Sequence, residues 1–170
     1  MNNKEEVFVT NSFEETQRLG EKFIKDILRL HLRGGSVNVA LYGDLGSGKT
    51  TFAQGVAKGL GIERRIISPT FIIVRRYELQ AKSSKPKSQN YNSKLKSLER
   101  FYHIDLYRIQ GEKDLESLGL QEIMEDPESI VVIEWAEKLG SLLPEKRWDL
   151  RFEYLGEDKR RIAVSKISNF

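Results

Sequence analysis

The stretch Gly43-Asp44-Leu45-Gly46-Ser47-Gly48-Lys49-Thr50 fits the phosphate-binding loop pattern G-x-x-x-x-G-K-[ST]. Residues 37–42 before it are mostly apolar and strand-like, and residues 51–58 after it have the composition of a helix. In this order the glycines let backbone N–H groups point inward around phosphate oxygens, and the helix aims its positive end at them. A glycine-rich turn can precede a helix by chance, but strand, loop, Lys-Thr and helix together favour a nucleoside triphosphate site.

Each polar side chain at the end of this loop has an expected role. Lys49 can reach the β- and γ-phosphates, the Thr50 hydroxyl can ligate Mg²⁺, and Thr51 can contact a further phosphate oxygen. We therefore expect the nucleotide to contact the whole segment, namely Gly43, Asp44, Leu45, Gly46, Ser47, Gly48, Lys49, Thr50 and Thr51.

The composition is that of an ordinary globular protein. A chain of 170 residues, 39% hydrophobic and 31% charged, suits one domain spanning residues 1–170. The lack of cysteine excludes disulfides and thiolate metal sites. The sequence shows neither a secretory leader nor an apolar run of membrane-spanning length, so we expect a cytoplasmic protein without a membrane segment.

The net charge of +3 is concentrated in one segment. Residues 81–100 hold six basic residues and one acidic residue, a net of +5, which leaves about −2 for the rest of the chain. This segment is rich in Ser, Lys, Asn and Gln and has few apolar residues to bury. We expect a flexible basic loop at about residues 80–100 between two strands, in preference to a basic arm that binds RNA or a partner.

The hydrophobic periodicity outside this loop predicts strands and helices in alternation. Residues 7–10 are strand-like, and Ser12 with Glu15 has the form of a capping box that opens a helix running to Gly34-Gly35. The turn before this helix can touch a nucleotide base. The other expected elements are a hairpin from Tyr77 across the basic loop, a short helix at 114–120 extended by Ile123 and Met124, and a closing hairpin at 148–154 and 160–165.

Residues 66–74 are strand-like except at Pro69. The Ser-Pro-Thr turn can place the Thr70 hydroxyl near the γ-phosphate, in the manner of a switch threonine. A bulge or a strand start set by the proline is the alternative, and the residues alone leave both open.

Two carboxylates are candidates for contact with the metal and the attacking water. Residues 102–107 alternate as a strand, so His103 and Asp105 share one face. Asp105 suits Mg²⁺ or water unless it is a surface residue, whereas His103 is a packing or hydrogen-bonding residue rather than a metal ligand. Glu134 follows the apolar run 130–133, expected as a buried parallel strand, where a phosphate-loop enzyme holds Mg²⁺ or polarises water. The alternative for Glu134 is an edge-exposed carboxylate.

Several segments occur together in a fixed order: 43–52, Ser68-Pro69-Thr70-Phe71, His103-Ile104-Asp105-Leu106-Tyr107-Arg108, Leu118-Gly119-Leu120 and Ile133-Glu134-Trp135. In this combination the chain resembles the TsaE family, bacterial ATPases needed to make threonylcarbamoyladenosine in tRNA. The lysine-rich segment at 80–100 departs from the family, which usually has a short turn there.

The resemblance implies a single phosphate-loop NTPase domain of α/β class, with three layers (α/β/α), a mixed, mainly parallel central sheet and antiparallel hairpins. It implies Mg²⁺-dependent ATP hydrolysis, weak in isolation, by a cytoplasmic protein that acts on the TsaB–TsaD complex and on tRNA only indirectly. By position, the resemblance assigns phosphate binding to Lys49 and the metal to Thr50 and Glu134. It assigns a supporting role in catalysis to Asp105 and a switch role to Thr70.

The residues by themselves are also compatible with two other functions. A small-molecule kinase would use Arg64-Arg65 or Arg75-Arg76 to clamp its substrate and the basic loop as a lid. A GTP switch would need an Asn-Lys-x-Asp motif to read guanine, and the sequence lacks one, so adenine is favoured. We rank the partner-coupled ATPase first, the kinase second and the nucleotide switch third. Phosphate release without an added acceptor would separate the ATPase from the kinase.

Overall fold

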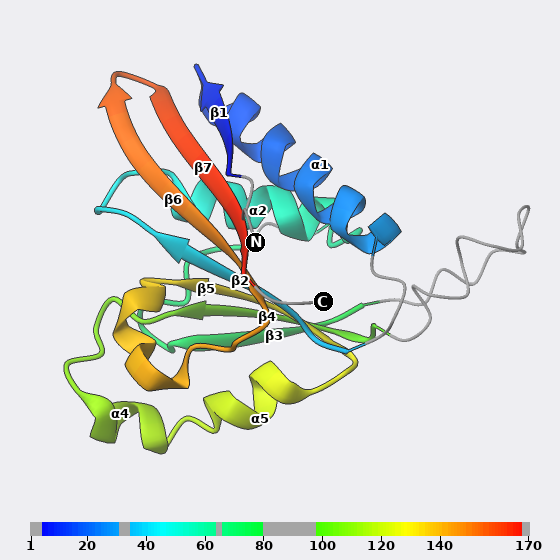
Figure 1. Ribbon diagram of the computed structural model, residues 1–170, viewed down its shortest axis with the longest axis vertical. Coiled ribbons are helices and arrows are strands. Elements are labelled where there is room, and N and C mark those ends of the chain that lie inside the picture. Colours follow the sequence, from blue (N-terminus) through cyan, green and yellow to red (C-terminus); the bar gives the residue numbers. More distant parts are fainter. Residues whose placement is uncertain (1–4, 31–34, 64–65, 80–97, 168–170) are drawn as a thin grey trace, which may run out of the picture.

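The structure, a computed structural model, describes residues 5–30, 35–63, 66–79 and 98–167. These residues form one seven-stranded sheet with the order β1-β7-β6-β2-β5-β4-β3 (Figure 1). In chain order the strands are β1 (Glu6–Thr10), β2 (Val37–Tyr42), β3 (Val74–Glu78), β4 (Arg100–Asp105), β5 (Ser129–Glu134), β6 (Arg147–Gly156) and β7 (Lys159–Ile167). The helices are α1 (Phe13–Leu30), α2 (Lys49–Gly59), α4 (Glu112–Glu116), α5 (Leu120–Glu125) and the 3-10 helix η1 (Ala136–Leu142).

The sheet is mixed and mainly parallel, as the family resemblance implies. The neighbouring strands β6, β2, β5 and β4 all run in one direction. At one edge β3 pairs antiparallel with β4, and at the other edge β7 pairs antiparallel with both β6 and β1. The two expected antiparallel pairs, β3–β4 and β6–β7, are therefore confirmed. Most of the basic loop predicted at about residues 80–100 lies outside the described residues.

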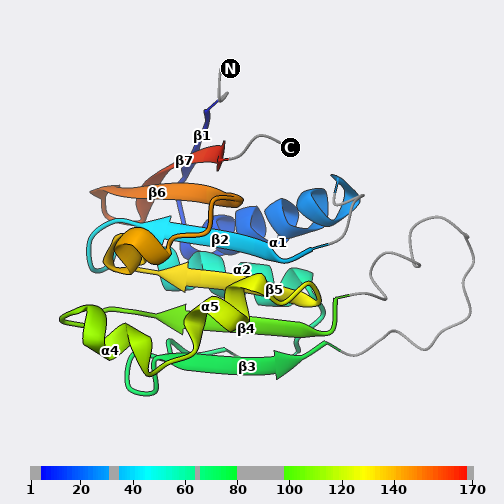
Figure 2. The same ribbon diagram turned by 60° about the horizontal axis from the view of Figure 1, so that its bottom comes forward.

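Helices cover both faces of the sheet, which gives the predicted three layers. α1 and α2 lie on one face, and α4, α5 and η1 lie on the other (Figure 2). Alternate residues of β2 point to the two cores: Val39 and Leu41 pack with α1 and α2, whereas Ala40 and Tyr42 pack with the opposite layer. A strand covered on both faces is mostly apolar, which is why residues 37–42 and 130–133 lack strict alternation.

The first helix begins where its sequence predicts. The Ser12 hydroxyl accepts a hydrogen bond from the Glu15 N–H at 3.1 Å, as an N-cap does. The Glu15 carboxylate accepts from the Asn11 N–H at 2.7 Å, one residue earlier than a capping box requires. α1 then packs closely on α2, because a Cβ on Gly55 would lie only 2.1 Å from the Gln17 carbonyl oxygen. This contact fixes the start of α1 beside the phosphate loop.

Two expected elements differ in the structure. The strand expected over residues 66–74 begins only at Val74, because the Pro69 carbonyl accepts hydrogen bonds from the N–H groups of Ile72 and Ile73 and closes a turn. The helix expected at 114–120 is two short helices, separated where Gly119 takes a φ of 59°. In the part of the chain that the structure describes, no helix is long and apolar enough to cross a membrane.

Candidate functional site

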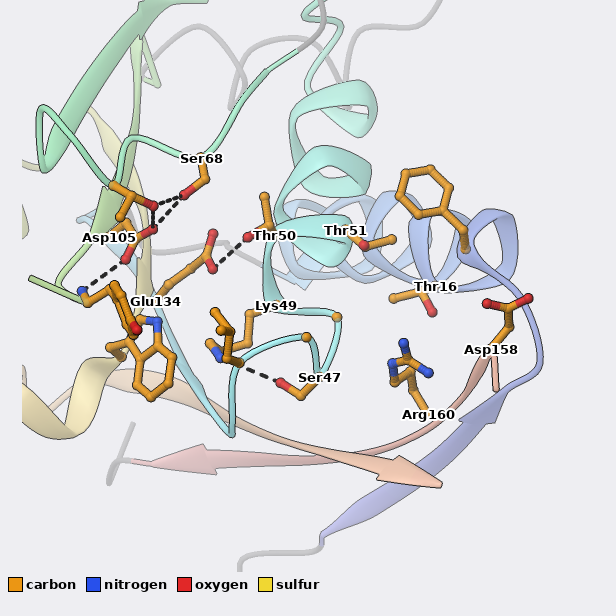
Figure 3. Close-up of a pocket in the computed structure, with 17 residues that line it drawn as sticks. Thr16, Ser47, Lys49, Thr50, Thr51, Ser68, Asp105, Glu134, Asp158 and Arg160 are labelled. Carbon is orange, nitrogen blue, oxygen red and sulfur yellow. Dashed lines mark hydrogen bonds between the residues drawn. The ribbon is translucent and has the colours of Figure 1, made fainter. Parts of the chain in front are cut away.

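A pocket of about 370 Å³ opens at the carboxyl ends of β2, β4 and β5 (Figure 3). These strands are parallel, so their carboxyl ends meet at one edge of the sheet, where open α/β sheets bind ligands. The residues that line the pocket are Phe13, Thr16, 45–51, Ser68, Thr70, Asp105, Tyr107, Glu134, Trp135, Asp158 and Arg160. The pocket thus collects five other segments of the chain around the phosphate loop.

The glycines of the loop between β2 and α2 adopt backbone conformations that other residues rarely reach. Gly43, Gly46 and Gly48 have φ angles of 137°, 76° and 103°. A Cβ on Gly43 would lie 2.4 Å from the Phe152 carbonyl oxygen of β6, so this position also lacks space for a side chain. α2 begins directly after Gly48, and the N–H groups of its first turn have no partner within the helix. Such a helix start suits an anion.

The ammonium group of Lys49 is held over its own loop. Its Nζ donates to the carbonyl oxygens of Gly43 at 2.5 Å and Asp44 at 2.8 Å, and it lies 4.0 Å from the ring centroid of Trp135. Burial lowers the pKa of Lys49, while the carboxylates around it, Glu134 foremost, act in the opposite direction. Nζ also donates to the Ser47 hydroxyl at 3.5 Å, so the hydrogen-bond acceptors of this buried cation are all neutral oxygens, and it would gain from a phosphate group.

Glu134 lies at the end of β5 with its carboxylate directed at the start of α2. Its Oε2 accepts a hydrogen bond from the Thr50 hydroxyl at 2.8 Å, and its Oε1 lies 2.7 Å from Nε2 of His103. The residue is 2% exposed, so the alternative of an edge-exposed carboxylate is wrong. The next residue, Trp135, has a φ of 59°, a left-handed conformation uncommon for a bulky residue, and its side chain lines the same pocket.

Asp105 lies at the end of β4 and gathers three donors. Its Oδ2 accepts from the hydroxyls of Ser68 and Thr70, each at 2.5 Å, and its Oδ1 accepts from the Tyr107 N–H at 2.9 Å. The segment forms a turn at Pro69, and that turn brings the Thr70 hydroxyl into the pocket, whereas the role of Thr70 as a switch residue stays a prediction. At 3% exposure Asp105 is not a surface residue.

The donor set of the pocket is made of oxygen atoms, which suits a hard cation. No group of three or more His, Asp or Glu side chains that could hold a metal occurs among the described residues. Mg²⁺ does not need one, because it is usually bound through one or two carboxylates together with substrate phosphates and water. The Thr50 hydroxyl and Glu134 therefore fit Mg²⁺ accompanied by a nucleotide, and they do not form a metal site on their own.

Most of the predicted site residues meet in this pocket. Leu45 to Thr51, Thr70, Asp105 and Glu134 line it, whereas Gly43 and Asp44 contribute through the carbonyls that hold Lys49. The residues that the sequence analysis did not assign to the site are Phe13, Thr16, Ser68, Tyr107, Trp135, Asp158 and Arg160. Ser68, Tyr107 and Trp135 had a usable signal, since each stands within two residues of a predicted site residue.

Arg160 reaches the pocket from the β6–β7 hairpin. Its side chain covers the phosphate loop, because a Cβ on Gly48 would lie 3.5 Å from its Cγ, and its guanidinium lies 4.6 Å from the Tyr154 ring. In Figure 3, Thr16, Asp158 and Arg160 lie at the opposite end of the pocket from Glu134, Asp105 and Ser68. The phosphate loop therefore lies between the end of the pocket with the carboxylates of Glu134 and Asp105 and the end with the Arg160 guanidinium.

Comparison with known proteins agrees with this arrangement. The family model described as threonylcarbamoyl adenosine biosynthesis protein TsaE matches residues 10–162. Among curated relatives, a tRNA threonylcarbamoyladenosine biosynthesis protein TsaE from Haemophilus influenzae is 33% identical over 152 residues, 89% of this chain and 84% of the relative. The protein of the same name from Bacillus subtilis is 36% identical, over 77% of this chain and 70% of the relative.

Two further matches cover nearly the whole chain. The TsaE protein of Treponema pallidum is 33% identical over 92% of this chain and 98% of its own length. The crystal structure of Bacillus subtilis YdiB superposes with a TM-score of 0.66 at 25% identity, covering 99% of this chain and 90% of that one. Family, relatives and fold agree with the phosphate-loop pocket: this chain belongs to the TsaE family of threonylcarbamoyladenosine biosynthesis proteins.

Proposed function

We propose that this protein is a Mg²⁺-dependent ATPase that serves threonylcarbamoyladenosine modification of tRNA by acting on the TsaB–TsaD complex. It would do so as one cytoplasmic domain spanning residues 1–170, without direct contact to tRNA. The observation that carries the proposal is the convergence of two buried carboxylates, Glu134 and Asp105, on the pocket that the phosphate loop lines. Family membership supports the biosynthetic role.

The phosphate-binding part of the proposal follows from the contacts of Lys49 and Thr50. The triphosphate would replace the carbonyls of Gly43 and Asp44 as partners of the Lys49 ammonium, with the glycine N–H groups and the start of α2 around it. Thr50 donates its only hydroxyl hydrogen to Glu134, so the lone pairs of its oxygen remain available to Mg²⁺. When bound, the cation would neutralise charge on the phosphates.

The two carboxylates suit the hydrolytic end of the pocket. A nucleotide with its phosphates on the loop would direct its last phosphate toward Glu134 and Asp105, and its nucleoside toward Thr16 and Arg160, the opposite end in Figure 3. Glu134 would orient the metal and the attacking water, and Asp105 would support them while holding the switch residue Thr70. Phe13, a half-exposed ring on the pocket wall, and the Arg160 guanidinium offer flat surfaces on which an adenine base can stack.

Exposed apolar side chains around the mouth of the pocket support the proposal that a partner protein covers it. Leu45 and Phe71 are 74% and 82% exposed, and Ile67 and Ile72 beside the Ser-Pro-Thr turn are about half exposed. The Arg108 guanidinium lies 4.3 Å from the Phe71 ring. Exposed apolar patches of this kind mark surfaces for other proteins. We propose that TsaB–TsaD docks here.

Phosphate release from Mg-ATP without an added acceptor tests the proposal. The protein alone should release phosphate slowly, since Arg160, the only described arginine that lines the pocket, lies at the end opposite Glu134, and addition of the TsaB–TsaD pair should raise the rate. Phe71→Ser should remove this stimulation but leave the basal rate unchanged, because Phe71 does not line the pocket. Absence of release in both conditions would contradict the ATPase and favour the small-molecule kinase, which an acceptor screen would then identify.

A further inference from the structure

The buried carboxylate of Glu134 has a hydrogen-bond partner on each oxygen. The Thr50 hydroxyl occupies Oε2, and Nε2 of His103 lies 2.7 Å from Oε1. A buried carboxylate needs such partners, because its unpaired charge would be costly away from water. One partner belongs to the phosphate loop, and the other comes from the interior of the sheet.

His103 is buried without a connection to solvent. It lies on β4 opposite Val132 of β5, two residues before Asp105, so its side chain is on the same face as Asp105. The residue is 0% exposed, and among the described residues its Nδ1 has no hydrogen-bond partner. Its only side-chain hydrogen bond in this part of the chain is therefore the one to Glu134.

This pattern assigns the proton of the imidazole. With the proton on Nε2, the ring donates to the carboxylate and leaves Nδ1 as an acceptor without a donor. With the proton on Nδ1, a buried N–H would have no acceptor, and the bare Nε2 would face the carboxylate as a second acceptor. A proton on Nε2, donated to the Glu134 carboxylate, is the arrangement that the contacts favour.

We propose that His103 is a positioning residue whose Nε2–H fixes the Glu134 carboxylate, so that the other carboxylate oxygen holds the Thr50 hydroxyl in place for Mg²⁺. The proposal rests on the proposed function. A glutamate side chain with one anchor can turn about three bonds, whereas two anchors define the direction of both oxygens. Groups that hold a metal-site ligand in this way typically change affinity or activity about 10–100-fold when they are removed.

Two substitutions separate positioning from packing. In His103→Leu the donor is lost, and in His103→Gln an amide N–H of comparable reach is retained. For His103→Leu we expect ATP binding without Mg²⁺ to stay within about twofold, while the tightening by Mg²⁺ is reduced and hydrolysis falls about 10–100-fold. His103→Gln should recover most of both losses. Binding is followed with a fluorescent ATP analogue, and folding by circular dichroism.

Asn38→Leu is the matched control. Asn38 is another buried polar strand residue, and its Nδ2 donates to the Met124 carbonyl at 3.0 Å, but it does not line the pocket. This variant should lose stability and keep the Mg²⁺ response. Equal losses in His103→Leu and His103→Gln, or a wild-type Mg²⁺ response in folded His103→Leu, would overturn the positioning role. A wild-type protein that fails to bind or hydrolyse Mg-ATP would instead refute the proposed function.

A spectroscopic measurement adds a readout that is independent of ATP binding and hydrolysis. The sequence has two histidines, His31 and His103, so His31→Asn assigns the imidazole nitrogen signals. Long-range ¹H–¹⁵N spectra should show His103 protonated on Nε2, with a proton signal that shifts in Glu134→Ala. A proton on Nδ1, or a signal that is unchanged in Glu134→Ala, would contradict the proposal.

Discussion

Glu134→Gln is the substitution that tests the site most directly, because it keeps the shape of the side chain. The carboxylate accepts hydrogen bonds on both oxygens, from Thr50 at 2.8 Å and from His103 at 2.7 Å. An amide offers one acceptor, so its NH₂ group must face one of these donors. Loss of one hydrogen bond to a charged group costs about 1.5–3 kcal/mol, and the negative charge beside the metal is lost as well. Loss of a positioned charge in a catalytic site slows reactions about 10²–10³-fold.

We therefore expect Glu134→Gln to bind ATP within about threefold of wild type and to hydrolyse it about 10²–10³ times more slowly. Single-turnover phosphate release with and without the TsaB–TsaD pair measures the rate, and a fluorescent ATP analogue measures binding. Glu125→Gln is the control, since it makes the same change on an exposed residue at the end of α5. Wild-type turnover in Glu134→Gln would refute the role of this carboxylate, and loss of ATP binding would show that it acts in binding instead.

Three further outcomes follow from the loop. Lys49→Ala should abolish ATP binding. An unchanged ATP affinity in that variant would show that this loop is not the ATP site. Burial lowers the pKa of Lys49 in the folded chain, so between this pKa and the ordinary value of 10.5 the unfolded chain binds more protons than the folded chain. The contribution of Lys49 to the free energy of unfolding therefore increases as pH rises through that range. Phosphates would raise the pKa of Lys49 again, so ATP affinity should fall as pH rises through the lowered pKa. Calorimetry in two buffers should show proton uptake, and an affinity independent of pH throughout the range up to 10.5 would argue against this coupling. Gly43→Ala should lower the free energy of unfolding by about 2 kcal/mol or more, through its positive φ and the contact at 2.4 Å with the Phe152 carbonyl oxygen. Gly61→Ala is the control, because Gly61 has a positive φ but no neighbour within 4 Å, so this variant should lose only the part due to backbone strain. Urea unfolding compares the two variants, and equal losses would show that the contact with Phe152 does not contribute.

The sequence by itself determined the phosphate loop and the layered fold. The demands on residues 43–50 are local, since a turn with positive φ at three positions needs glycine whatever surrounds it. The apolar runs at 37–42 and 130–133 indicated strands covered on both faces for an equally local reason, the exclusion of polar side chains from two cores. Glu134 could be proposed because it follows such a run directly.

The tertiary structure alone decided how the distant candidate residues contact one another and which further residues join the loop. The register of β4 against β5 places Asp105 beside Glu134 and brings His103 within reach of the Glu134 carboxylate, and no pattern within either strand encodes that register. Pairing of β6 with β2 carries Arg160 across the loop in the same way. Local conformational preferences act over a few neighbouring residues, whereas strand register is set by packing of the whole sheet, and the complete site exists only once that packing has formed.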